Sequence, residues 1–368
     1  MPESTSTSDT VKRKARHSLE RNESRLAAML MLPSFVVLII IAIYPLGSVF
    51  YTSFTDREFA SSREVQYVGL ENYANLLSMT IRELPPQIDE ETGEVVRDPE
   101  TGAVVYERSI NVLPREPRRY RELNQFSLFG TRYVLGASDR EFVRSVGDTV
   151  LFTIMSVLLE TVLGLIIALV MNSYFPGRGM MRAVMLVPWA VPTAVSSRIW
   201  EWMFASSRVG MFNVVFQRLG IGDGQISFLT NQGSQVWAMI AIDVWKTTPF
   251  MALLLLAGLQ LIPRQIYESA YVDGANKVRQ FFSITLPLLR PTLAVALVFR
   301  TLDALRVFDL FQIILAQKRY SMASFTYYQL IDNQAMGYSS ASSVIIFLLI
   351  LLFTILYVRL VGGTRNEE

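Results

Sequence analysis

Six long apolar stretches constrain this chain more than any other feature of its sequence. Each is about as long as the ~20 residues that a helix needs to cross the hydrocarbon core of a bilayer. Lipid offers no hydrogen-bond partner to an open backbone, so such stretches cross as helices. The stretches are residues 28–50, 148–171, 182–204, 235–261, 291–315 and 342–360. We therefore expect an all-α, polytopic membrane protein with six transmembrane helices.

Composition narrows the chemistry that such a protein can perform. Of its 368 residues, 51% are hydrophobic and 18% are charged. The net charge of +2 is too small to indicate a nucleic-acid-binding surface. Cysteine is absent, and the single histidine, His17, lies in a basic stretch, which removes thiolate chemistry, histidine triads and histidine-rich metal sites. The G-x-x-x-x-G-K-[ST] pattern for nucleotide phosphates is also missing. We expect no catalytic residue, no metal and no cofactor in this chain.

The orientation of the spans follows from the basic residues in the short connecting segments. Residues 1–27 form a basic tail, and the first apolar stretch that follows is too long for a signal peptide, so we expect it to be an anchor. Basic residues recur after the second and fourth stretches and in the tail 361–368, at Arg178, Arg182, Arg264, Lys277, Arg279, Arg290 and Arg365. We expect both termini in the cytoplasm of a bacterial or archaeal cell, with a core of five helices over 148–360.

Two local features modify this simple picture. Pro188 and Pro192 fall inside the third stretch and should kink it, since proline removes a backbone donor. The segment 51–147 would lie outside the membrane, where residues 94–106 favour two short strands about a turn. We expect a small extracytoplasmic insert there, with a partly ordered loop as the alternative.

The loop between the fourth and fifth stretches, residues 262–290, carries the most specific pattern, and we call it the coupling loop. Pro263 favours the start of a short helix and Gly274 its end. A second short helix should follow and end before Pro287. Apolar bulk at Ile266, Tyr267, Ala270 and Tyr271, with an acid at Glu268, suits insertion into a groove of a partner.

This loop resembles the EAA loop of binding-protein-dependent ABC importers. The resemblance rests on Glu268, Ser269, Ala270 and Gly274, followed by Ile284, Leu286 and Pro287. Ser269 replaces the alanine that is usual at that position. Tyr67 to Tyr73, Asp243 to Phe250 and Leu302 to Asp309 are similar to segments of the maltose-transporter-type branch, whereas residues 80–135 and 317–320 depart from it.

The resemblance implies both a function and a set of partners. It implies a permease subunit that moves a sugar, a polyol or glycerol phosphate by alternating access, with the coupling loop, including Tyr271, docked on an ATPase. The partners would be a second homologous permease, two ATPase subunits that hold ATP and Mg²⁺, and an extracytoplasmic solute-binding protein. Whether this chain or the second permease holds the main solute site stays open, as does any role of the insert in docking the binding protein.

Charged residues recur in the fifth stretch at every third position. They are Arg300, Asp303, Arg306 and Asp309, and each costs roughly 2.5–3.5 kcal/mol inside a span unless it faces a wet cavity or an ion partner. One interpretation is the wall or gate of a solute path. The other is an internal ion-pair ladder or pairing with the second permease. Trp189 and Trp245 present the same choice between contact with sugar and anchoring at the membrane interface.

Three other classes of membrane protein are less consistent with these features. An ion-coupled carrier usually shows internal repeats around a midplane site and would leave the coupling loop unexplained. A membrane enzyme needs a convergent acid–base or metal set. A scaffold would not need charges at mid-membrane. The carrier stays as the alternative function.

Overall fold

The computed structural model describes residues 26–89, 92–207, 209–221 and 224–363. Most of the basic tail, with His17, and residues 364–368 of the C-terminal tail lie outside that range. Within it, five helices are long and apolar enough to cross a membrane, namely Leu26–Thr52, Arg140–Asn172, Gln232–Gln260, Lys277–Ala304 and Met336–Arg359. Long apolar helices are thus confirmed at the first, second, fourth and sixth predicted positions.

The predicted third span is divided into three short helices. These are α6 (Arg178–Met185), α7 (Val187–Ala190) and α8 (Thr193–Met203). Val191 and Pro192 are extended, with ψ of 129° and 138°. Proline disfavours a helical conformation in the residue before it and removes its own N–H, so the expected kink is a complete break. That α6 to α8 together cross the membrane stays a prediction.

The predicted fifth span, 291–315, was misplaced. The helix begins at Lys277 and runs through α12 (Lys277–Gln280), the π-helical turn η2 (Phe281–Thr285) and α13 (Leu286–Ala304). The expected end before Pro287 is also wrong, because Pro287 lies in the first turn of α13, where its missing N–H is tolerated. After Ala304 the chain continues through a turn into η3 (Phe311–Leu315) and η4 (Ala316–Lys318).

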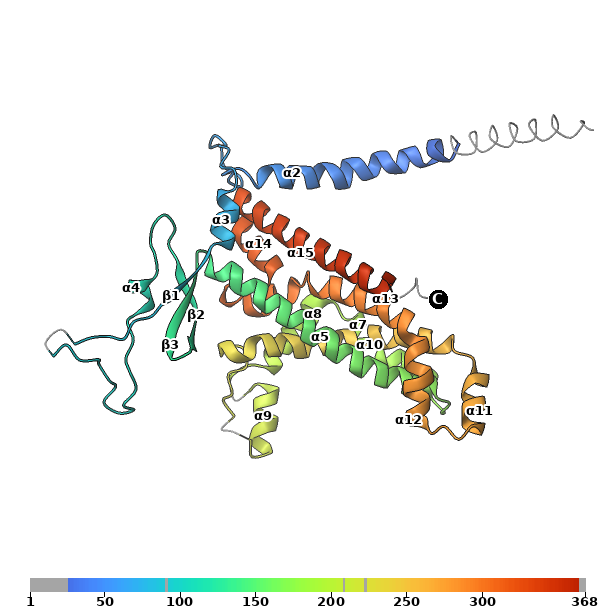
Figure 1. Cartoon of the computed structure of the whole chain (residues 1–368). Helices are drawn as coiled ribbons and strands as arrows, with labels where there is room; N and C mark the ends of the chain where they lie inside the picture. The colour runs from blue at the N-terminus through green and yellow to red at the C-terminus, as the bar shows by residue number, and fades with distance from the viewer. Residues whose placement is uncertain (1–25, 90–91, 208, 222–223, 364–368) are drawn as a thin grey trace, which may run out of the picture.

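The core of the helical bundle lies between α5 (Arg140–Asn172), α10 (Gln232–Gln260) and α13 (Figure 1). α14 (Met322–Ile331) and α15 (Met336–Gly363) complete the bundle. Small residues bring the main helices close together. A Cβ added at Gly258 of α10 would lie 2.6 Å from Thr292 Oγ1 of α13. A larger side chain there would push the two helices apart.

The first span stands apart from the bundle. It comprises residues 26–38, the π-helical turn η1 (Ile39–Ile43) and α2 (Tyr44–Thr52), and none of its apolar window is buried. Figure 1 shows it projecting away from the other helices. Its last turn contacts α15, where the rings of Phe50 and Phe347 lie 5.8 Å apart. This helix must therefore be covered by lipid or by another subunit.

A small antiparallel sheet caps one end of the bundle and was not predicted. Its strand order is β1 (Met79–Glu83), β3 (Thr131–Ala137), β2 (Arg121–Leu128), and the short helices α3 (Glu71–Leu77) and α4 (Ser109–Val112) flank it. The expected hairpin around 94–106 exists as isolated backbone pairing rather than regular strands, with bridges Arg97–Val104 and Ile88–Val95. The fold is mostly helical, as expected, with this sheet as an addition.

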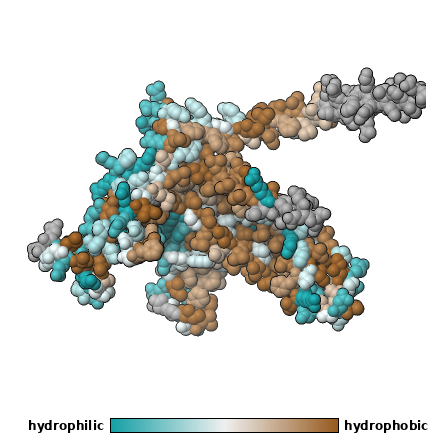
Figure 2. Space-filling model, viewed as in Figure 1, coloured by the Kyte–Doolittle hydropathy of each residue, from teal (hydrophilic) through white to brown (hydrophobic). Residues whose placement is uncertain are grey.

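The surface separates these parts by polarity. Figure 2 shows a brown apolar band over the helices between hydrophilic surface at the sheet and at α11–α12. Such a band, bounded at both ends by polar surface, is the pattern of a bundle that lies in lipid. The short helix α9 (Met211–Arg218) lies beside the band.

Candidate functional site

The coupling loop stands at the end of the bundle opposite the sheet (Figure 1). Its first helix, α11 (Arg264–Val272), begins directly after Pro263 and ends before Gly274, as predicted. Gly274 has φ of +78°, a conformation that side chains with a Cβ rarely adopt. The turn is closed by Ala275 N donating to Ala270 O at 2.9 Å. Local sequence thus determines the shape of this knob.

The outer face of α11 carries exposed acid and apolar side chains together. Glu268 and Ser269 are exposed, Tyr271 is 73% exposed and Val272 is 84% exposed. Ala270 is half-buried. The expectation that Tyr267 joins the outer patch was wrong, because its hydroxyl lies 3.0 Å from Thr285 Oγ1 at the base of the loop. An exposed apolar surface on a helix projecting from the bundle is suited to a partner's groove.

The second half of the motif forms the base of the knob. Ile284, Leu286 and Pro287 are half-buried where η2 continues into α13. Buried Gln280 donates from Nε2 to Ala275 O at 3.0 Å and so fixes the turn after α11. Sequence reasoning missed Gln280, since nothing in the local pattern marks it as buried. The loop is consequently attached to a helix that runs unbroken to Ala304.

That helix ends in a buried cluster of charged residues. Arg300, 2% exposed, pairs with Glu160 through Nε–Oε2 at 2.6 Å and Nη2–Oε1 at 2.8 Å. It also donates from Nη2 to Asp243 Oδ2 at 3.0 Å. Thr247 donates to Glu160 Oε1 at 2.5 Å. One arginine thereby joins α5, α10 and the last turns of α13.

Glu160 is the residue of this cluster that sequence reasoning overlooked. It is fully buried and lies in the apolar run of α5. Because a single carboxylate in such a run is costly without a cation, its presence could have signalled a partner on another span. Arg300 supplies that cation, in agreement with the internal ion-pair interpretation.

The other three charges of the fifth stretch do not form one stripe with Arg300. Asp303 accepts from Arg300 Nη1 at 2.5 Å, yet its side chain is 69% exposed. Arg306 and Asp309 are exposed and follow the end of α13, so the three-residue spacing no longer places them on one helix. Asp303 alone combines a buried cationic support with an accessible carboxylate.

Trp189 lies in α7, just before the break in the third span, whereas Trp245 lies on α10 and contacts the helix after the break. Trp189 is 49% exposed and stacks on Phe250 of α10 at 5.8 Å. Trp245 is 41% exposed and lies edge-on to Trp200 of α8 at 5.4 Å. Lys246 Nζ donates to Val191 O at 2.5 Å, so a neighbouring span satisfies a carbonyl that the break releases. A break in a helix at membrane depth is tolerated where protein groups or water form hydrogen bonds with the freed backbone groups, as Lys246 does here.

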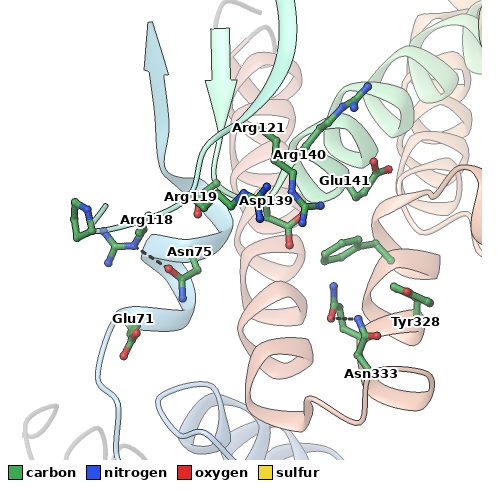
Figure 3. A pocket seen from close by; sticks show the side chains of 14 residues that line it. Glu71, Asn75, Arg118, Arg119, Arg121, Asp139, Arg140, Glu141, Tyr328 and Asn333 are labelled. Atoms are coloured by element: carbon green, nitrogen blue, oxygen red, sulfur yellow. Dashed lines mark hydrogen bonds between the residues drawn. The ribbon is translucent and has the colours of Figure 1, made fainter. Parts of the chain in front are cut away.

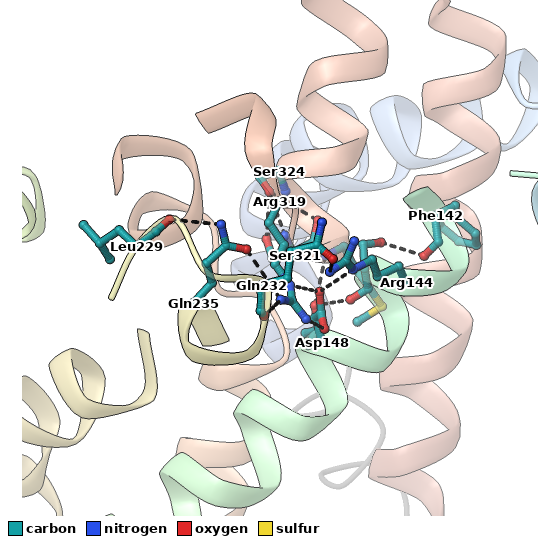
Figure 4. Close-up of polar contacts among 12 residues, drawn as sticks. Phe142, Arg144, Asp148, Leu229, Gln232, Gln235, Arg319, Ser321 and Ser324 are labelled. Atoms are coloured by element: carbon teal, nitrogen blue, oxygen red, sulfur yellow. Dashed lines mark hydrogen bonds and ion pairs between the residues drawn. The ribbon is translucent and has the colours of Figure 1, made fainter. Parts of the chain in front are cut away.

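A second buried arginine joins the helices nearer the sheet (Figure 4). Arg319 binds both oxygens of Asp148 in α5, with Nε–Oδ2 and Nη2–Oδ1 distances of 2.5 Å. It also donates to the backbone of Gln232 at the start of α10. Ser321, the N-cap of α14, accepts from Ser324 N at 3.1 Å. Residues 317–320, where the resemblance weakens, thus contain an anchor of the fold.

Metal binding finds no support among the residues that the structure describes. No group of three or more histidine, cysteine, aspartate or glutamate side chains is placed to hold a metal ion in that part of the chain. The buried acids are instead paired with arginine.

Comparison with known proteins gives consistent matches. Residues 160–366 match the family described as the binding-protein-dependent transport system inner membrane component. The trehalose/maltose transport permease MalF of Thermococcus litoralis is 47% identical over 241 residues, 64% of this chain and 79% of the relative. The sulfoquinovosyl glycerol transport permease SmoG of Agrobacterium fabrum is 31% identical over 350 residues, 93% and 92% of the two chains.

The fold has a solved counterpart. A chain in the crystal structure of a bacterial alginate ABC transporter has a TM-score of 0.65 and 18% identity to this chain. The alignment covers 92% of this chain and 93% of that one. The family match extends over the coupling loop, the Arg300 cluster and the spans that hold them. This chain belongs to the family of inner-membrane components of binding-protein-dependent transport systems and is a non-catalytic, multi-pass membrane subunit.

Proposed function

We propose that this chain is a permease subunit of an ATP-driven importer of a carbohydrate, with α11 as the element that receives the motion of a separate ATPase. The observation that carries the proposal is the exposed face of α11, which presents Glu268, Tyr271 and Val272 on a knob fixed to a transmembrane helix. ATP and Mg²⁺ belong to the ATPase subunits in this scheme. The chain itself needs no bound cofactor.

The path of the motion follows the contacts at the base of the loop. Gln280 and Tyr267 attach α11 to the segment that becomes α13. Because the helix continues to Ala304, a displacement of α11 moves the end that carries Arg300. The Arg300 cluster then passes that displacement to α5 and α10. Alternating access would be a rearrangement of these packed helices.

We propose a sugar or related polyol as the solute, as in the relatives named for trehalose, maltose and sulfoquinovosyl glycerol. The path would include Asp303, Trp189 and Trp245, since sugars bind carboxylates through hydroxyl groups and aromatic rings through C–H faces. Arg300 would support Asp303 from behind. Arg306 and Asp309, which are exposed beyond α13, would lie at the wall nearer the outer face or against the second permease.

A second, homologous permease is the partner that the first span favours. None of its apolar window is buried within this chain, which leaves the helix free to pack against a neighbouring subunit as well as lipid. We further propose two cytoplasmic ATPase subunits at α11 and a solute-binding protein at the opposite end of the bundle. This places both termini in the cytoplasm of a bacterial or archaeal cell and the sheet outside it.

The test is a charge reversal on α11 with a matched control. Glu268→Lys should leave the assembled protein in the membrane and reduce ATP-dependent uptake at least about tenfold, because the reversed charge opposes docking. Glu100→Lys makes the same charge change on an exposed residue of the insert, away from the proposed ATPase contact, and should leave co-purification of the ATPase subunits unchanged. Uptake into ATP-free proteoliposomes by the chain alone would favour an ion-coupled carrier instead.

A further inference from the structure

A pocket with several arginines lies where the sheet meets the helical bundle (Figure 3). Its volume is about 590 Å³, within the usual range for small-ligand sites. The segment leading into β2 contributes Arg118 and Arg119, β2 contributes Arg121, and α5 contributes Arg140. The coupling loop lies at the opposite end of the molecule, so this pocket is separate from the site described above.

The arginines have more donors than the protein satisfies. Arg118 donates from Nε to Asn75 Oδ1 at 2.8 Å. Among the described residues, the side chains of Arg119 and Arg121 have no hydrogen bond or ion pair. Arg140 Nε is buried without a hydrogen-bond partner in that part of the chain. The guanidinium groups of Arg119 and Arg121 therefore have free N–H donors in this pocket, and Arg140 lines its margin with its guanidinium directed away from them (Figure 3).

Three acids also line the pocket, but among the described residues none forms an ion pair with its arginines. Asp139 accepts from Phe142 N at 2.9 Å through Oδ1 and from Tyr338 OH at 2.8 Å through Oδ2. Glu71 and Glu141 belong to the first turns of α3 and α5, where the helix dipoles favour a carboxylate. Figure 3 shows these two at opposite margins of the group, with Arg119 and Arg121 between them. The centre of the pocket keeps cationic donors.

We propose that this pocket binds a phosphate group, either that of an anionic phospholipid or free phosphate. Planar guanidinium groups match tetrahedral oxyanions through paired, charge-assisted hydrogen bonds. The pocket lies beside Arg140 at the start of α5, about two turns (~12 Å) before the predicted span 148–171, so it lies outside the hydrocarbon core, where a lipid headgroup or a free anion can reach it. Tyr328 and the Asn333–Gln329 pair on α14 line the same pocket and offer hydrogen bonds to a glycerol headgroup. A bound phosphate would connect the sheet to the bundle.

The test uses the assembled importer in two arms. The first counts phosphatidylglycerol retained by the purified complex in native mass spectrometry. The second measures binding of labelled orthophosphate to the complex in phosphatidylcholine nanodiscs. The variant is Arg119→Gln with Arg121→Gln. The control is Arg82→Gln with Arg218→Gln, which removes the same charge from exposed positions outside the pocket.

The variant should lose at least about tenfold in one arm while the control matches the wild type, since charge-assisted hydrogen bonds are being removed. Loss in the first arm identifies a lipid headgroup, and loss in the second arm identifies free phosphate. Equal binding by variant and control in both arms, or no binding by the wild type in either, overturns the proposal. Equal thermal unfolding midpoints of variant and control establish that the fold is intact.

Discussion

The coupling loop and the Arg300 cluster hold charge in opposite ways. Glu268 is exposed, whereas Arg300 and Glu160 are buried and satisfy each other. The loop therefore contributes little to the stability of the isolated chain but presents a surface to a partner. The cluster contacts three helices and presents only Asp303 to the outside. A recognisable motif thus marks the proposed place of coupling, while the residues that hold the helices together carry no motif.

The largest effect should come from removing the cation of the cluster. Arg300→Met leaves Glu160 and Asp243 without their shared partner, and breaking a buried ion pair in this way costs about 3–5 kcal/mol. Arg306→Met removes an exposed arginine six positions away and should change stability by no more than about 0.5 kcal/mol. Thermal unfolding of the purified protein in detergent measures both.

A double variant sharpens this result. Glu160→Gln added to Arg300→Met removes one unpaired charge and should restore part of the lost stability. If Arg300→Met and Arg306→Met unfolded at the same temperature, the cluster would have no structural role.

An intermediate effect is expected where two spans meet at a glycine. Gly258→Ala adds a Cβ that would lie 2.6 Å from Thr292 Oγ1 and 2.7 Å from Thr292 Cβ, and such overpacking costs about 1–3 kcal/mol. The double variant Gly258→Ala/Thr292→Ser removes the methyl group at 2.7 Å but keeps Oγ and Cβ of residue 292, so it should recover part of the lost stability. Recovery in the unfolding midpoint would locate the strain at this crossing, and a neutral Gly258→Ala would show that the helices separate freely.

The smallest loss of stability should come from a substitution at Gly274 in the coupling loop. Gly274 has open space around it, so Gly274→Ala meets no atom and costs only the strain of φ near +78°, about 1 kcal/mol. The strain is local to α11, so uptake should fall while the unfolding midpoint hardly moves. Gly102→Ala imposes a similar strain, at φ of +67°, on the turn after Arg97 and serves as the control. Equal uptake by the two variants would show that the shape of the Gly274 turn does not affect coupling.

The sequence predicted most of the helices and the outer part of the coupling loop, because both depend on local patterns. Apolar runs locate the spans, and Pro263 with Gly274 sets the ends of α11. The prediction of the fifth span is wrong for two reasons. It includes the charges near Arg306 in the helix, and it assigns the segment from Lys277 to a separate short helix of the coupling loop. A helix that begins in polar residues and contains Pro287 gives no local signal of its continuity.

The partner of Arg300 could not be assigned from the sequence for a different reason. Glu160 and Arg300 are 140 positions apart, and their contact depends on how α5 packs against α13. The sheet could not be predicted for a similar reason, because the paired residues of β1 and β3 are fifty or more positions apart. The β2–β3 turn, Phe129-Gly130, adopts positive φ at both positions, but phenylalanine is a poor signal for such a turn.

The exposed first span has a consequence for the life of the subunit in the cell. Its contact with α15 is at its last turn, around Phe50, so the remaining helices can pack while this one stays free in the bilayer. A chain made without its proposed second permease would keep an unshielded helix, which is the kind of feature that membrane proteases recognise. The amount of this protein should then follow the synthesis of that other permease, with any surplus degraded.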